Sequence, residues 1–136
     1  MTRETRFTAG QDLIVVRGTV EGPRGIASIR LVVDTGASRT IIVPEILDDI
    51  GYSARNGQVT STVSSAIGRE RGYSLRVERF ATLGFAMNRF VVHVFDLMDH
   101  SKFDGLIGLN FLRHFNYEVR SAEGCIVLEN LAPLAA

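Results

Sequence analysis

Apolar and polar residues alternate in short runs along most of the chain, which is the pattern of half-buried β-strands. Turn signals at residues 21–25 and 121–124 predict that the first two strands and the last two form hairpins. Short strands with frequent turns predict a mostly β domain. The expected strands cover residues 12–20, 26–33, 40–43, 58–64, 80–85, 88–95, 117–120 and 125–129, with a return strand at Leu75 and Val77.

Helical spacing replaces the alternation in two short segments. Pro44 suits the first position of a helix, and Gly51 suits its end. A second helical patch surrounds Phe111. The residues expected on the buried helix faces are Ile46, Leu47 and Ile50 in the first segment, and Phe111, Leu112 and Phe115 in the second.

The remaining segments are expected to be connections. Residues 65–72 form a small, glycine-punctuated link inside a long hairpin, and residues 97–103 form a polar loop. Gly84 is expected to break the strand over residues 80–85. Residues 130–136 form a loosely ordered tail.

Length and composition favour a single domain over residues 1–136, large enough to bury a core without disulfides. The 15 basic and 15 acidic residues balance and are scattered, so nothing in the charge pattern indicates a nucleic-acid partner. The single cysteine, Cys125, lies in an apolar run and is expected to be a buried structural thiol. No apolar run is long enough for a membrane span, and residues 1–6 are too polar to begin a signal peptide. We therefore expect a cytoplasmic protein.

The stretch with the clearest chemical potential runs from Leu31 to Ser38. Three apolar residues end in the carboxylate of Asp34, which is followed at once by the small residues Thr35 and Gly36. Asp34 is therefore expected at the end of a strand, on a loop carried by rigid structure, where catalytic groups are common. A strand that simply ends in an Asp-Thr-Gly turn is the competing interpretation of this stretch alone.

A second motif, Leu106-Ile107-Gly108-Leu109-Asn110-Phe111-Leu112, follows some seventy residues later. The two motifs together, at this separation and among strands, resemble the retropepsin-like aspartic proteases, in particular their single-domain bacterial members. The resemblance spans residues 12–128 and implies a closed β-barrel lobe with one or two short helices and a flap hairpin. It also implies activity as a two-fold homodimer, and the sequence holds only one Asp-Thr-Gly to contribute.

The chemistry implied by the resemblance is hydrolysis of peptide bonds in extended polypeptide. Two Asp34 side chains that meet across a two-fold axis cannot both ionise cheaply, so they share a proton. One accepts a proton from a water that attacks the peptide carbonyl, while the other polarises that carbonyl. No metal and no cofactor is implied. His93, His100 and His114 show no metal-ligand spacing.

The resemblance also implies supporting roles, residue by residue. Thr35 corresponds to a hydroxyl that bonds across the dimer, and Gly36 corresponds to a glycine whose backbone bonds the substrate. Leu106, Ile107 and Gly108 correspond to the segment packed beneath the active-site loop. The flap is implied over residues 64–72, with Ala66, Ile67 and Gly68 expected to contact the substrate.

Three positions, Ala37 and Ser38 after Asp34 and Leu109 after the second motif's glycine, affect the expected dimer contacts and the expected pH of activity. At the positions of Ser38 and Leu109, the retroviral members of the family carry an acidic residue and an arginine, which form an ionic pair near their dimer contact. The dimer contacts here are therefore expected either to be weaker or to be built by residues 1–10 or the tail instead. Ala37 offers no hydroxyl to the charged carboxylate, so we expect activity at mildly acidic to neutral pH.

Two other functions compete with the protease. A non-catalytic, dimeric peptide-binding domain on the same fold would not need Asp34, Thr35 and Gly36 together. A β-barrel that binds a small apolar ligand leaves the Asp-Thr-Gly turn unexplained. A serine hydrolase is disfavoured because Ser64, Ser65 and Ser74 lie in no Ser-His-Asp arrangement.

Overall fold

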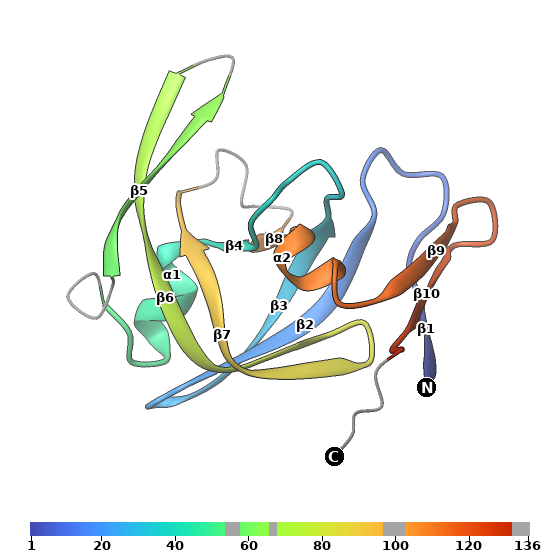
Figure 1. Ribbon diagram of the computed structural model, residues 1–136, viewed down its shortest axis with the longest axis horizontal. Coiled ribbons are helices and arrows are strands. Elements are labelled where there is room, and N and C mark those ends of the chain that lie inside the picture. Colours follow the sequence, from blue (N-terminus) through green and yellow to red (C-terminus); the bar gives the residue numbers. More distant parts are fainter. Residues whose placement is uncertain (54–57, 66–67, 97–102, 132–136) are drawn as a thin grey trace.

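The computed structural model describes residues 1–53, 58–65, 68–96 and 103–131, with the backbone alone for residues 58–65 and 68–71. Ten strands and two short helices follow one another along these ranges (Figure 1). The mostly β prediction with two short helices is confirmed. The elements are β1 (Thr2–Arg6), β2 (Val15–Gly22), β3 (Gly25–Val33), β4 (Ile41–Ile42), α1 (Pro44–Asp49), β5 (Gln58–Ser65), β6 (Gly68–Thr82), β7 (Phe85–Val94), β8 (Gly105–Ile107), α2 (Leu109–Leu112), β9 (Asn116–Arg120) and β10 (Cys125–Glu129).

Seven strands form one sheet that closes on itself, in the order β2-β3-β8-β4-β7-β6-β5. An additional pairing between β2 and β6 completes a barrel from the first six strands of that order. The pairs β3–β8 and β4–β7 are parallel, and the other described pairs are antiparallel. The closed-barrel prediction is therefore confirmed. Beyond the barrel, β5 and the first part of β6 rise together as a hairpin (Figure 1).

The barrel interior is filled by the inward-facing residues that the alternation predicts. Phe80 stacks on Phe90 with ring centroids 5.1 Å apart, and Phe111 of α2 meets Phe80 edge-on at 5.5 Å. Such offset and edge-to-face pairs are favourable beyond the area they bury. The largest fully buried side chains are Val20, Ile29, Leu31, Ile42, Leu47, Val77, Phe80, Ile107, Phe111, Leu112, Ile126 and Leu128. The core therefore fixes β3, β8 and α2 to one another.

A second sheet of three strands, in the order β1-β10-β9, lies beside the barrel (Figure 1). The hairpin β9–β10 agrees with the prediction, whereas no pattern of the sequence indicates β1, whose residues are polar. Its backbone pairs with β10 from Thr2 opposite Glu129 to Arg6 opposite Cys125. Cys125 is buried, as predicted, and burial and the neighbouring Glu4 raise the pKa of its thiol.

Most predicted elements have the expected limits. The hairpin β2–β3 turns at Pro23-Arg24, α1 begins at Pro44, and its residues Leu47 and Ile50 are buried. The predicted tail over residues 130–136 and the loop over residues 97–103 lie largely outside the described residues.

Two boundary predictions were wrong. Residues 68–72 are not a connection but the start of β6, because they pair with β5 from Gly68 opposite Ser65 to Gly72 opposite Ser61. Gly72 serves close packing instead of a turn, since a Cβ there would lie 2.2 Å from the Val94 carbonyl oxygen. Residues 80–85 are not a separate strand either. Leu83 and Gly84 both have positive φ and make the two-residue turn that joins β6 to β7.

Candidate active site

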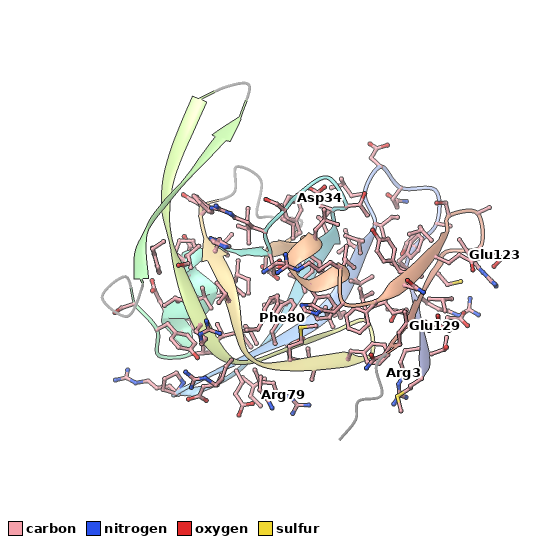
Figure 2. All side chains as sticks on the ribbon, in the orientation of Figure 1. Arg3, Asp34, Arg79, Phe80, Glu123 and Glu129 are labelled. Atoms are coloured by element: carbon pink, nitrogen blue, oxygen red, sulfur yellow. The ribbon has the colours of Figure 1, made fainter. Side chains whose placement is uncertain are left out.

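Asp34 lies where the chain leaves β3, on a loop that neighbouring segments hold at its start. The Asp34 N–H donates to the carbonyl oxygen of Ile107 at 3.0 Å, and the Val33 N–H donates to that of Ile14 at 2.9 Å. Figure 2 shows Asp34 at one edge of the barrel, on the side toward which the β5–β6 hairpin rises. The side chain is half-buried. The loop therefore presents a carboxylate from a rigid strand end.

The loop turns back on its own carboxylate. The Gly36 N–H donates to Oδ1 of Asp34 at 2.9 Å, and the Ala37 N–H donates to the Asp34 carbonyl oxygen at 3.2 Å. A Cβ at position 36 would lie 3.3 Å from the same Oδ1, closer than most side-chain contacts. The bond from Gly36 orients one carboxylate oxygen, the bond from Ala37 closes the backbone turn, and glycine at position 36 lets the backbone approach the carboxylate.

The second motif lies directly against the start of this loop. Leu106 pairs with Val32, and Ile107 pairs with Val33, in a parallel ladder. At position 108 a Cβ would lie 2.3 Å from the carbonyl oxygen of Arg39, so only glycine fits there. The structure thus brings Leu106, Ile107 and Gly108 together with Asp34, although they are some seventy residues apart.

Helix α2 closes the other side of the loop through its first backbone groups. The N–H of Leu109 donates to the Ala37 carbonyl oxygen at 2.8 Å, and the N–H of Asn110 donates to that of Ser38 at 3.2 Å. The loop is therefore bound to β8 at one end and to α2 at the other.

A polar pair that the sequence analysis missed locks the far end of the loop. Thr40 is fully buried, and both its N–H and its hydroxyl donate to Oδ1 of Asn110, at 2.8 Å and 2.7 Å. The Asn110 amide donates in turn to the Val91 carbonyl oxygen at 3.0 Å. The Gly108 N–H donates to the Thr40 hydroxyl at 3.2 Å. A signal existed in the sequence, since Asn110 is the one polar residue between Leu106 and Leu112 other than glycine.

The remaining predicted site residues differ in what the structure describes. Thr35 and Gly36 are exposed and Ala37 is half-buried. Gly68 opens strand β6, whereas Ala66 and Ile67 lie outside the described residues.

Asp104 and His93 have surroundings that differ from those of Asp34. Asp104 accepts a hydrogen bond from the Arg30 N–H at 2.8 Å and lies 3.6 Å from that residue's Nε, so it joins β8 to β3. Burial, and then the charge of Arg39, lower the pKa of His93 from its usual 6.5. In the described part of the chain, no three His, Cys, Asp or Glu side chains gather in a way that could hold a metal ion.

The helices in the described ranges are too short to cross a membrane.

Comparison with known proteins places this arrangement in a family. Residues 16–111 match the family described as aspartyl protease. A retropepsin-like aspartic protease from Rickettsia conorii has a similar fold, with a TM-score of 0.71, 17% sequence identity, and coverage of 96% of this chain and 91% of that one. No curated protein matches the sequence. The family match spans more than half of the chain and includes both the Asp34 loop and β8, so this chain belongs to the aspartyl protease family and has the retropepsin-like fold.

Proposed function

We propose that the protein is an aspartic endopeptidase that acts as a homodimer, with Asp34 of each chain as the catalytic residue. The observation that carries the proposal is the single Asp34 loop, anchored to β8 and α2 with its carboxylate at the barrel edge. An aspartic protease needs two such carboxylates, and each chain offers one Asp-Thr-Gly.

The proposed mechanism requires the two carboxylates to share one proton. When the Asp34 side chains meet across a two-fold axis, their repulsion disfavours the doubly charged state. The charged member takes a proton from a water molecule, which attacks the peptide carbonyl carbon. The protonated member donates to the carbonyl oxygen and then helps to protonate the leaving amine. The pair titrates as a unit, which gives a bell-shaped dependence of rate on pH.

The surface around Asp34 supports an apolar contact between the two subunits. Leu13 precedes Ile14, whose carbonyl oxygen accepts a hydrogen bond from Val33, the residue before Asp34. On the other side of the Asp34 loop, the Leu109 N–H donates to the Ala37 carbonyl oxygen. Both leucines are unusually exposed for their type, at 43% and 37%. Since the two Asp34 loops have to meet, residues that flank them have to meet the partner as well. We propose that these leucines form that contact, with the Thr35 hydroxyl bonding across it.

Substrate would lie between the Asp34 loops and the β5–β6 hairpin. We propose that the hairpin closes as a flap, with Ala66, Ile67 and Gly68 at its tip, and that backbone groups at Gly36 bond the peptide. The hairpin rises from the barrel on the side where Asp34 is found (Figure 2), which supports this arrangement. Lids of this kind exclude water and hold the substrate in place.

The test is Asp34→Asn, measured for peptide cleavage and for dimer formation by analytical ultracentrifugation. We expect cleavage to fall by about 10³-fold or more while the dimer stays intact, because a neutral amide cannot activate water. Asp49→Asn is the matched control: it makes the same chemical change at an exposed aspartate on α1. Unchanged cleavage in Asp34→Asn, or failure of the wild type to cleave any peptide or bind a transition-state mimic, would instead support a non-catalytic peptide-binding domain.

A further inference from the structure

A groove with a marked positive charge lies outside the barrel, between β7 and the end of α2. It has a volume of about 630 Å³, and its lining includes Arg76, Arg89, Arg113 and His114, together with His93. None of the described residues that line it is acidic. The whole chain has equal numbers of acidic and basic residues, so this basic groove is a local concentration of charge.

Arg89 is exposed, and its backbone has an unusual conformation. Its φ of 53° is in the left-handed region, which residues other than glycine seldom adopt. The Nη1 of Arg76 donates to the Arg89 carbonyl oxygen at 2.8 Å, which ties the two arginines to one place on the sheet. Local strain of this kind often marks a binding site, so it motivates a search for a ligand.

Three arginines of the groove are not neutralised by ion pairs within the part of the chain that the structure describes. The ion pairs found there involve Arg6, Arg30 and Arg120. Arg76, Arg89 and Arg113 form none of them, and all three are exposed. Clustered like charges repel one another, and an anion bound between them relieves that repulsion.

The lining also suits a polymer better than a single ion. Met87, Phe90 and Val91 add apolar surface between the cations. The volume is in the range of sites that hold drug-sized molecules, far larger than one phosphate needs. We propose that the basic groove binds an acidic segment of polypeptide, with carboxylates on the arginines and aliphatic stems on the apolar surface.

A second cavity provides a matched control. It has a volume of about 490 Å³ and is lined by Arg17 and Arg79 beside hydroxyl residues, small residues and the apolar Leu83 and Phe85. Figure 2 shows Arg79 at the opposite side of the barrel from Asp34. Replacing these two arginines changes the net charge of the chain by the same amount as replacing two arginines of the basic groove.

The experiment measures binding of a fluorescent oligoglutamate peptide by anisotropy, in the Asp34→Asn background so that no peptide is cut. We expect Arg89→Gln with Arg113→Gln to weaken binding about tenfold, and Arg17→Gln with Arg79→Gln to change it by about twofold at most. An oligoglutamine peptide should not bind, and binding of oligoglutamate should weaken as salt is raised. Amide shifts in the same Asp34→Asn protein should concentrate on residues 87–91 and 110–114, a readout that needs no change in the groove.

Three outcomes would overturn the proposal. Equal losses in the two double variants would mean that oligoglutamate responds only to net charge. Displacement of the peptide by inorganic phosphate at the same concentration would indicate a simple ion site. Absence of oligoglutamate binding at low salt would remove the site altogether. Because cleavage is not measured, none of these results depends on whether Asp34 is catalytic.

Discussion

Removal of the Asn110 side chain should destabilise the protein strongly, although the residue is polar and partly exposed. In Asn110→Ala, the buried Thr40 loses the acceptor for both its N–H and its hydroxyl, and the Val91 carbonyl oxygen loses a donor. A buried polar group left without a partner costs about 1–3 kcal/mol. We therefore expect a loss of about 3–5 kcal/mol, a large share of the roughly 5–15 kcal/mol that stabilises a typical domain.

The assay is urea and thermal unfolding at one fixed protein concentration, since dimerisation makes the melting temperature depend on concentration. The expected loss corresponds to a fall of about 10–20 °C in Tm for a domain of this size. Asn110→Asp keeps the acceptor for Thr40 but sets a carboxylate oxygen against the Val91 carbonyl oxygen in place of the amide donor, so it should recover only part of the loss. Asn88→Ala, at an exposed position of β7, is the control and should stay within about 0.5 kcal/mol of the wild type.

The reasoning also predicts coupling between Asn110 and Thr40. Thr40→Val removes the hydroxyl but keeps the N–H, so the double variant with Asn110→Ala should cost less than the sum of the two single variants. Additive losses would refute the shared network. A loss below about 1 kcal/mol in Asn110→Ala would refute the claim that this side chain holds the Asp34 loop.

Three further predictions concern other positions. Gly108→Ala places a Cβ 2.3 Å from the Arg39 carbonyl oxygen; it should cost about 2–3 kcal/mol in urea unfolding and lower kcat, and wild-type behaviour would contradict the close packing. Leu109→Asp should weaken the dimer at least about tenfold in ultracentrifugation by adding a charge to the proposed apolar contact, next to the Asp34 loop; salt should hardly change the wild-type dimer. The pKa of His93 is lowered in the folded protein, so the stability that the neutral imidazole contributes is complete above the usual pKa of 6.5 and is lost as the pH falls below that value. Between about pH 7 and pH 5, His93→Gln should therefore lose less stability than the wild type. Equal losses would exclude this contribution of His93.

The barrel was predictable wherever one face of a strand is buried. Phe90, Val92 and Val94 alternate with more exposed neighbours, and the structure buries all three. Strand β1 was not predicted because it buries little side-chain surface and is held mainly by backbone pairing with β10. Such pairing leaves no apolar periodicity in the sequence. Gly72 looked like a turn residue because the sequence does not show that the Val94 carbonyl approaches it in space.

The candidate site was predictable in outline, but its supports were not. Asp34 and Gly108 are marked by local motifs, one after a strand and one before a helix. The bonds from Asn110 to Thr40 join residues 70 positions apart, and no local pattern carries that pairing. Long-range polar contacts of this kind depend on the folded barrel.

The most direct measurement is a subunit-mixing titration, in which Asp34→Asn chains are added to a fixed amount of wild-type protein above the concentration at which it dimerises. If each active site needs Asp34 from both chains, mixed dimers are inactive. Peptide cleavage should then fall to about one half at equal amounts and to about one quarter at a threefold excess. Cleavage that stays constant as the variant is added would mean that one chain acts alone, and would contradict a site built from two copies of Asp34.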